Sequence, residues 1–428
     1  MHTPEPVPAE TKPGDETPAE VPTTPPATNE DPFEPITNNF NNVQTAQASS
    51  TQSSAAPNMI GDFLPAPFGV SLGNPLGPIL PYSPSTYAPA AGGTRLQIGQ
   101  NNSPLPRDRF AVTYNHFHNA YQMQTSTGEL TDAHLDLYTS QFEKTFNDGR
   151  SSVELRIPVY SAPNNTQTLE VGNDDVDGYS MEFGNISMIM KRVLIQDCRN
   201  SFVVTTGMGL TIPTGPDSRF IGDPTIPATN SITVRNQALS LTPYVATLFR
   251  PSDRVFSQFF MQADFALNGN DFNYTNGATV VNGDLNDQHI LKFDWQTGIW
   301  LMAPPCGGCT DCCGYDSCCD SGCCGLGGGG GGMIRNIAAI FELHYATTMN
   351  NADLITVTDP GLTGPVNFGN GYNRVDVLNA TVGCTTLVGS QGALTTAISL
   401  PLNEISDNVR AFDHELILQY NHYLFPAR

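Results

Sequence analysis

Hydrophobic and polar residues alternate along four stretches of the chain, SVELRIPVY (152–160), VFSQFFMQADFALN (255–268), LKFDWQTGIWL (291–301) and NIAAIFELHYA (336–346). Successive side chains of a strand point to opposite faces, so this pattern predicts strands with one apolar and one polar face. Weaker patterns predict eight more strands, near 108–117, 133–145, 183–195, 202–213, 234–250, 374–385, 393–402 and 411–425. The predicted fold is all-β, an antiparallel array of about twelve strands.

The lengths of the links between these strands depend on their position in the order. Links after the second, fourth, sixth and tenth predicted strands are short: NDGRS, QDCRN, PSD and VGSQGA. Links after odd-numbered strands are mostly long and polar, as in SAPNNTQTLEVGNDDVDGYS. Short turns at one end and long loops at the other are typical of an outer-membrane β-barrel, with the turns in the periplasm. A β-sandwich is the alternative, but it would not require this difference between the two ends.

In a membrane barrel the apolar face contacts lipid and the polar face lines the lumen. The polar positions of the four best strands predict ten lumen-lining side chains: Glu154, Arg156, Gln258, Gln262, Asp264, Lys292, Asp294, Gln296, Glu342 and His344. Charges of both signs could select the solutes that pass. The alternative, equally open from sequence, is that these side chains pair with one another and fill a narrow barrel.

Composition divides the chain into three regions. Residues 1–58 are rich in Pro, Glu, Thr and Ser and poor in large apolar side chains, which predicts a disordered spacer in the periplasm. Residues 59–106 are apolar but interrupted by proline, which excludes a regular helix or central strand and makes them a candidate lumen plug. Residues 107–428 form the predicted barrel.

A cysteine-rich insert, 306–332, interrupts the barrel after the eighth predicted strand, on the end of the short turns. Eight cysteines fall within it: Cys306, Cys309, Cys312, Cys313, Cys318, Cys319, Cys323 and Cys324. Disulfides would order a loop that has no apolar core, and the periplasm permits them. Cysteine-only metal coordination and a disordered insert are the alternatives, so the metal content stays unknown. Cys198 and Cys384, near the same end, could pair with each other or with the insert.

Charge and motifs exclude several classes of function. The net charge of −22, with 14% charged residues and no basic cluster, argues against a nucleic-acid partner. We find no G-x-S-x-G, H-E-x-x-H or P-loop motif, so we expect no enzymatic activity and no cofactor. The sequence contains no run of 18 uncharged apolar residues, so it predicts no membrane-spanning helix. The first twenty residues contain neither a basic start nor an apolar run, so no signal peptide is visible.

Several motifs resemble a family of predicted outer-membrane β-barrels common in planctomycetes. They are NNSPLPRDRFAVTYNHFHNA (101–120), FEKTFNDGRSSVELRIPVY (142–160), GIWLM before the insert and IAAIFELHY after it. That family is similar to barrels of the meta-pathway phenol-degradation or long-chain fatty-acid transporter type. The resemblance, over roughly 95–425, implies an outer-membrane location and passive uptake of small solutes. One departure is that Phe425 is followed by three further residues, whereas such barrels commonly end on an aromatic residue.

The sequence therefore predicts an outer-membrane channel for passive passage or uptake of small solutes, hydrophobic ones included. Its expected partners are outer-membrane lipid, a small-molecule solute and a periplasmic or cell-wall partner for residues 1–58. The alternative is a structural or interaction protein of the envelope that uses the N-terminal tail and the cysteine-rich insert as contact sites. Solute flux through the protein separates these two functions.

Overall fold

The computed structural model describes residues 56–62, 95–124, 130–163, 166–169, 179–197, 200–222, 231–302, 333–358, 366–369, 373–404 and 410–424. All of them belong to one compact unit, Ala46–Arg428. The eight cysteines of the insert and Cys198 lie outside the described residues, as do residues 1–55 of the expected spacer and 63–94 of the expected plug. In the described part of the chain, no helix is long and apolar enough to cross a membrane.

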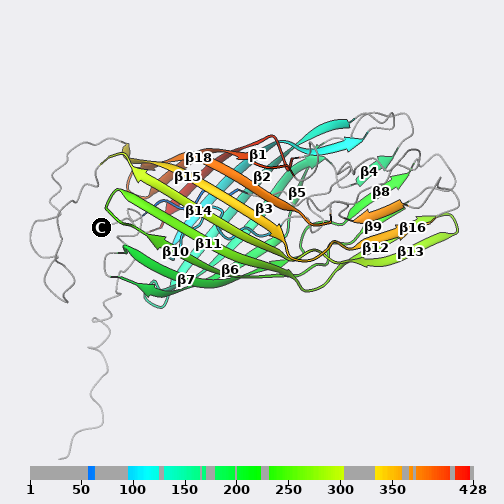
Figure 1. Ribbon diagram of the computed structural model, residues 1–428, viewed down its shortest axis with the longest axis horizontal. Coiled ribbons are helices and arrows are strands. Elements are labelled where there is room, and N and C mark those ends of the chain that lie inside the picture. The colour runs from blue at the N-terminus through cyan, green and yellow to red at the C-terminus, as the bar shows by residue number, and fades with distance from the viewer. Residues whose placement is uncertain are drawn as a thin grey trace, which may run out of the picture. The chain divides into compact units, whose positions relative to one another are not determined.

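Twelve antiparallel strands close into a barrel (Figure 1), which confirms the predicted fold class. In chain order they are β1 (Arg109–Gln124), β2 (Leu130–Phe146), β3 (Ser151–Pro163), β6 (Ile186–Gln196), β7 (Phe202–Ile212), β10 (Ser240–Phe249), β11 (Val255–Ala266), β14 (Ile290–Trp300), β15 (Ile334–Thr348), β18 (Asp376–Val388), β19 (Gly392–Pro401) and β20 (His414–Tyr423). The last strand pairs with the first, from Arg109 opposite Tyr423 to His118 opposite His414. This closure leaves no barrel strand with an unpaired edge.

Eight further strands lie in the long links or extend the barrel wall: β4 (Thr166–Leu169), β5 (Tyr179–Phe183), β8 (Ser218–Gly222), β9 (Ser231–Val234), β12 (Asn270–Asn276), β13 (Thr279–Leu285), β16 (Leu354–Val357) and β17 (Val366–Gly369). β4, β8, β9, β12 and β13 form a second sheet, and β16 pairs with β17 (Figure 1). The strand expected over 234–250 is divided between β9 and β10. The division arises because the Asn270 side chain accepts hydrogen bonds from the backbone amides of Gln237 and Ala238, at 2.9 Å each.

The short turns all connect strands at one end of the barrel, which we call the turn end. Asn147, Asp148 and Gly149 between β2 and β3 have φ values of 52°, 55° and 75°, a region that Asn, Asp and Gly tolerate best. β14 ends at Trp300 and β15 begins at Ile334, so the cysteine-rich insert also connects two strands at the turn end. We call the opposite end, with the long links, the loop end.

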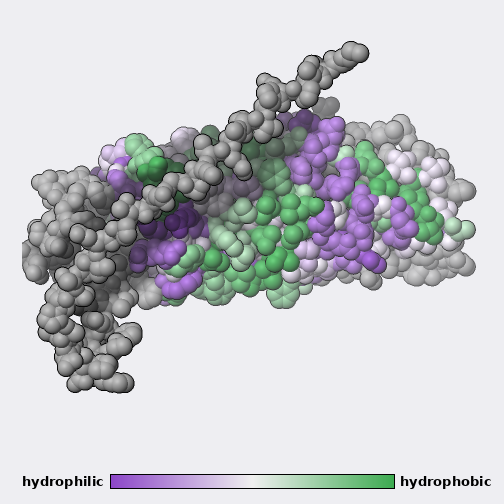
Figure 2. Space-filling view, turned by 90° about the horizontal axis from the view of Figure 1, so that it is seen from below, coloured by the Kyte–Doolittle hydropathy of each residue, from purple (hydrophilic) through white to green (hydrophobic). Residues whose placement is uncertain are grey.

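The outward face of the barrel is apolar on every strand. A band of hydrophobic surface crosses the barrel between hydrophilic regions (Figure 2). Each barrel strand contributes a large hydrophobic side chain that is at least 36% exposed: Val112, Phe142, Leu155, Met190, Met208, Val245, Met261, Trp295, Phe341, Val382, Leu400 and Leu418. Soluble monomers rarely expose a continuous apolar belt of this kind, whereas a membrane-spanning barrel requires one.

Two aromatic residues at strand ends, Trp300 on β14 and Tyr423 on β20, face the barrel interior. Trp300 is 2% exposed, and its ring lies 6.0 Å from that of Phe256. Tyr423 is 8% exposed and its hydroxyl accepts a hydrogen bond from Arg107 at 3.0 Å. Both rings lie in the barrel interior near the turn end, together with residues that precede β1 in the chain, such as Arg107.

Candidate functional site

The interior of the barrel is occupied by two stretches of the chain that precede β1. Residues 56–62 and 95–108, which we call the inner segments, are buried throughout their length. They pair with each other at one point, where the Met59 amide donates to the Asn102 carbonyl at 2.7 Å and the Asn101 amide donates to the Ile60 carbonyl at 3.1 Å. The first inner segment includes Ala56, Pro57 and Asn58, which are buried although they fall within the range expected to be a spacer.

The ten side chains expected to line the lumen are all buried and lie on inward-facing positions of β3, β11, β14 and β15. None is more than 3% exposed. They do not face an empty channel, because the inner segments lie against them. Their partners fall into three groups, which are backbone groups of the inner segments, side chains of the inner segments and charges on neighbouring strands.

Glutamine side chains of the wall bind the backbone of the inner segments. Gln262 accepts from the Ile98 amide and donates to the Leu96 carbonyl, both at 2.7 Å. Gln258 donates to the Pro57 carbonyl at 2.7 Å, and Gln296 donates to the Asn58 carbonyl at 3.2 Å. An irregular buried backbone cannot satisfy its own polar groups, and these wall side chains supply the missing partners.

The side chain of Glu342 on β15 binds main-chain amides of the first inner segment. Its carboxylate accepts from the Ile60 amide at 2.7 Å and from the Gly61 amide at 2.8 Å. It also accepts from Gln296 at 2.6 Å, and His344 Nε2 lies 3.1 Å from it. Hydrogen bonds to a charged acceptor are about twice as strong as neutral ones, so Glu342 is a principal attachment point of residues 56–62.

The second inner segment is attached to the wall by cations. The Arg156 guanidinium donates to the Gln97 carbonyl at 2.7 Å and to the Gln100 carbonyl at 2.9 Å. Lys292 Nζ lies 3.4 Å from the Leu96 carbonyl. In return, Arg95 of this segment approaches Asp264 at 3.7 Å.

Asp294 links a side chain of the second inner segment to the wall. It accepts from Gln97 at 2.8 Å, and the same oxygen lies 2.9 Å from His344 Nδ1. His344 thus lies between the two wall carboxylates, Asp294 and Glu342, each of which binds a different inner segment.

A buried cluster of charges near the turn end was not found from sequence. Arg109 donates to Glu143 at 2.9 Å and to Glu154 at 3.1 Å. Lys191 donates to Glu143 at 2.9 Å, and Arg156 donates to Glu154 at 2.6 Å. Arg109 lies on the polar face of RFAVTYN, whose alternation could have revealed it. Glu143 lies in a weakly alternating segment that gives no such signal.

The inner segments approach the wall closely where the wall carries glycine. A Cβ atom at Gly209 on β7 would lie 2.4 Å from Leu96 Cδ2, which is closer than any real contact. A larger residue at position 209 would therefore make the Leu96 side chain of the second inner segment shift.

A recess lies beside the second inner segment, between β2, β3 and β6. Its enclosed cavity has a volume of about 30 Å³, and the space that opens to solvent brings the total to about 350 Å³. Its apolar lining residues are Leu96, Leu137, Pro158 and Tyr160, and its polar ones are Arg95, Gln97, Gln100, Thr139, Arg156, Asn185 and Ser187. Lining of both kinds suits a small molecule that has an apolar body and at least one polar group.

The wall changes its pairing next to this recess. β3 pairs with β6 from Ser151 to Arg156 and with β5 from Val159 to Pro163. Between them, the Gly184 amide donates to the Pro158 carbonyl at 2.9 Å, and a Cβ atom at Gly184 would lie 2.2 Å from the Tyr160 ring. Pro158 has no amide hydrogen for the ladder, which explains why the register changes here.

Among the described residues, one group of three histidines, His116, His118 and His134, could hold a metal ion, and it lies outside the barrel. Within the described residues Cys384 has no disulfide partner; its half-buried sulfur lies 3.4 Å from the Thr396 hydroxyl.

Comparisons with known proteins give similarities of structure alone. No protein-family model matches the chain, and no curated protein matches it. A solved outer membrane channel from Pseudomonas putida F1 is 12% identical, with 74% of this chain and 96% of that chain covered and a TM-score of 0.39. The Pseudomonas putida toluene transporter TodX is 10% identical, with 74% of this chain and 89% of that chain covered and a TM-score of 0.37. A Pseudomonas aeruginosa FadL homologue is 10% identical, with 86% of this chain and 100% of that chain covered and a TM-score of 0.32. At such TM-scores we draw no conclusion about function from these similarities.

Proposed function

We propose that the protein is a passive channel of an outer membrane that admits small solutes, hydrophobic ones included. The observation that carries this proposal is a closed barrel with an apolar outward face and a polar interior that contains a small recess. The periplasm then lies at the turn end, since short turns are periplasmic in such barrels.

The inner segments serve as the gate of this channel. They are attached to the wall by hydrogen bonds, such as those of Gln262 and Arg156, and by apolar contacts of residues such as Ile60 and Ile98 with the wall. Water or a polar solute can replace the hydrogen bonds at a small net cost, and an apolar solute can take the place of the apolar contacts, which makes displacement of the segments feasible. The ten wall side chains would then line the opened lumen and contact the solute.

The recess is the candidate entry site for a small solute with an apolar body, because part of its lining is apolar. Its enclosed volume of about 30 Å³ holds only about two water molecules, so a solute enters it when the second inner segment moves aside. Leu137 and Tyr160 offer apolar contact, and Asn185 and Ser187 offer hydrogen bonds that orient the solute.

Replacing Leu137 with tryptophan is expected to fill part of the recess and lower the flux of a small aromatic solute at least tenfold. The measurement is uptake of the labelled solute into liposomes that contain the purified protein. Tyr138→Trp is the matched control, because Tyr138 lies on the same strand but is 39% exposed on the outward face. If Leu137→Trp passed the solute as fast as the control, the recess would not lie on the path.

The second candidate function is a closed structural or interaction protein of the envelope. The density of hydrogen bonds between the wall and the inner segments favours it, since a permanently filled barrel would show the same contacts. Residues 1–58 and the cysteine-rich insert would then be the contact sites, with a periplasmic or cell-wall partner. Liposomes with the wild-type protein that take up no more solute than protein-free liposomes would favour this function over a channel.

Two finer proposals accompany the channel. The thiols of the insert form disulfides, which a periplasmic location at the turn end supports. The chain belongs to the planctomycete barrel family, which the motifs at 101–120 and 142–160 support.

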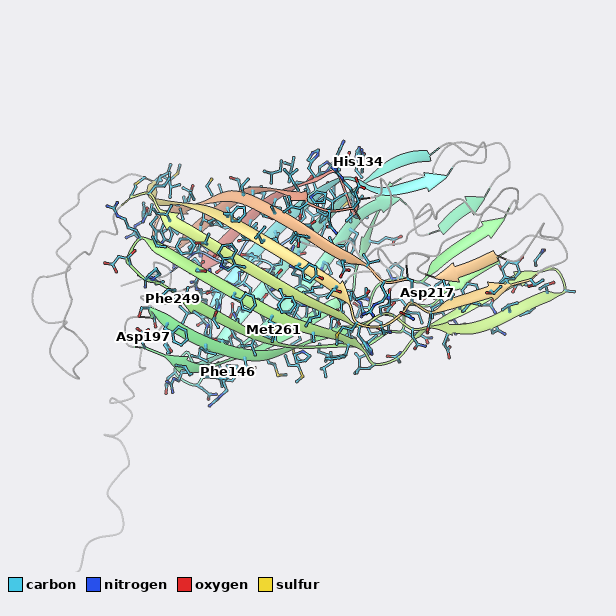
Figure 3. All side chains as sticks on the ribbon, in the orientation of Figure 1. His134, Phe146, Asp197, Asp217, Phe249 and Met261 are labelled. Atoms are coloured by element: carbon cyan, nitrogen blue, oxygen red, sulfur yellow. The ribbon has the colours of Figure 1, made fainter. Side chains whose placement is uncertain are left out.

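A membrane location predicts that a charge in the middle of the apolar belt is costly. Met261 lies midway along the barrel wall, and Phe249 lies close to the turn end (Figure 3). Met261→Arg is expected to lower the free energy of unfolding by about 2–4 kcal/mol, and Phe249→Arg by about 0–1 kcal/mol, because the cost falls towards the interface. Equilibrium unfolding in urea from lipid vesicles measures both. Equal effects of the two substitutions would contradict a belt that spans the hydrocarbon core.

A further inference from the structure

Four of the eight histidines of the chain gather on the outward face of the barrel towards the loop end. His116 and His118 lie two residues apart on β1, so they share a face, and both are half-buried. His134 is on β2, where the pairing with β1 is interrupted between Phe117 and Tyr121. His414 is the partner of His118 across the pairing of β1 and β20. None of these residues contributes to the barrel interior or to the recess.

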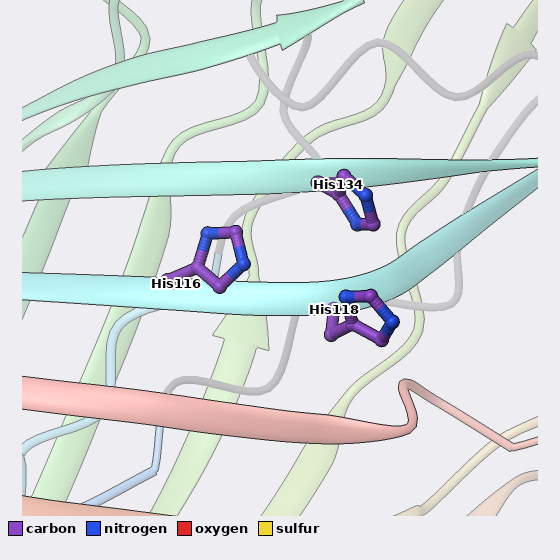
Figure 4. Close-up of side chains that lie close together, drawn as sticks. All are labelled: His116, His118 and His134. Carbon is purple, nitrogen blue, oxygen red and sulfur yellow. The ribbon is translucent and has the colours of Figure 1, made fainter.

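We propose that His116, His118 and His134 form a binding site for a divalent transition-metal ion of the zinc, copper or nickel type. The rings of His116 and His118 lie along β1 and that of His134 lies at β2 (Figure 4), and one nitrogen of each lies within 4.8 Å of the others. Two nitrogens bound to a tetrahedral zinc ion at 2.0–2.1 Å are roughly 3.4 Å apart. The rings of His118 and His134 stack, with centroids 4.5 Å apart and an interplanar angle of 18°, so metal binding requires these half-buried rings to turn about their χ angles until their nitrogens converge.

A carboxylate is already in place to orient one of the ligands. Asp136 lies opposite His116 in the strand pairing, and its Oδ1 is 2.7 Å from His116 Nδ1. The Tyr114 hydroxyl donates to the same oxygen at 2.8 Å, which holds the carboxylate still. A carboxylate that binds one ring nitrogen keeps the proton there and leaves Nε2 as the ligand atom, as is usual for metal-binding histidines.

Metal binding at His134 requires one change in its surroundings. The Asn119 amide donates to His134 Nδ1 at 3.3 Å, a long hydrogen bond. If Nε2 binds the metal, the neutral ring carries its proton on Nδ1, which can then no longer accept from the Asn119 amide. If Nδ1 binds the metal, its lone pair is no longer available to that amide. In both cases this long bond is lost, and Asn119 lies in the irregular part of β1 that can adjust.

The chemistry of the ligands selects the class of ion. Three imidazoles suit zinc, copper and nickel, whereas calcium and magnesium prefer oxygen ligands. Three protein ligands leave a fourth position for water or for an anionic oxygen at the membrane surface. The ring of His414 stacks on that of His118 with centroids 4.7 Å apart and restricts its motion. A bound ion would join β1 to β2 at the point where their backbone pairing is interrupted.

The test is metal binding by the full-length protein in detergent, measured by isothermal titration with zinc chloride and by metal analysis after dialysis. The thiols are alkylated first, so that the cysteine-rich insert contributes no zinc. We expect one zinc ion per chain with a dissociation constant in the micromolar range or lower, and no binding of calcium or magnesium at the same concentrations. A wild-type protein that binds no zinc would overturn the proposal.

Matched variants locate the ion. His118→Ala is expected to abolish the zinc equivalent, and Asp136→Asn to weaken binding about tenfold, because an orienting carboxylate is typically worth 10–100-fold. His422→Ala is the control, because His422 is an outward-facing histidine of β20 near the turn end. Each variant is first shown to be folded by its heat-modifiable migration on gels. Zinc bound equally by folded His118→Ala and His422→Ala would place the ion elsewhere and refute the site.

Discussion

Glu342→Ala is expected to release residues 56–62 from the wall and to raise the conductance of the protein in planar bilayers. The substitution leaves the Ile60 and Gly61 amides without their acceptor and removes a partner of Gln296. Truncating one partner of a buried, charge-assisted contact costs about 2–5 kcal/mol. At about 1.4 kcal/mol per factor of ten, the population with a detached segment rises at least roughly 30-fold.

Two measurements and two control variants test the effect of Glu342→Ala. Single-channel recording reports opening, and hydrogen exchange at the Ile60 and Gly61 amides reports detachment of the segment. Glu342→Gln keeps a carbonyl acceptor and should give an intermediate effect. Thr385→Ala should give none, because the hydroxyl of Thr385 bonds to Thr395 of the wall at 2.7 Å. Unchanged conductance in Glu342→Ala, with faster exchange at both amides, would show that residues 56–62 are not the gate.

Glu143→Leu is expected to be the most destabilising single change in the wall, and Arg109→Met a much milder one. The cluster near the turn end contains three cations, Arg109, Arg156 and Lys191, and two carboxylates, Glu143 and Glu154. Without Glu143, three buried cations share one carboxylate. Without Arg109, Lys191 still pairs with Glu143 and Arg156 still pairs with Glu154, so the charges balance.

Breaking a buried ion pair from one side typically costs about 3–5 kcal/mol, and we expect a loss of that size for Glu143→Leu. Its carboxylate also accepts from the Ser152 hydroxyl at 2.7 Å and from the Arg107 amide at 3.2 Å, which adds to the loss. Urea unfolding in lipid vesicles gives both free energies. An Arg109→Met variant as unstable as Glu143→Leu would show that charge balance does not govern this cluster.

Which side chains face outward and which face inward followed from the sequence alone where the strands alternate cleanly. In β11 and β14, Met261 and Trp295 are exposed while Gln262 and Asp294 are buried, as the period of two predicts. The alternating segments gave about twelve strands, and the lengths of the links between them predicted a closed barrel. The pattern was less informative in β2, where Glu143 was missed, and in the long links, where short strands such as β8 and β9 have no clear alternation.

The role of the inner segments could not be predicted beyond their being a candidate plug. Their proline-rich sequence excludes regular structure but does not specify partners, since those partners are side chains far away in the chain. Asn58 and Asn421, for example, are 363 residues apart and bond at 3.2 Å. The grouping of His414 with His116, His118 and His134 likewise depends on the closure of β20 onto β1.

The sequence by itself determined the fold class and the face of each strong strand, because the period of side-chain direction in a strand is a local property of the backbone. Only the tertiary structure decided that the inward-facing side chains bind the inner segments, that the charges of Arg109, Glu143 and Lys191 meet, and that three histidines share one space. These contacts depend on strand register and on barrel closure, which bring together residues that no local pattern relates.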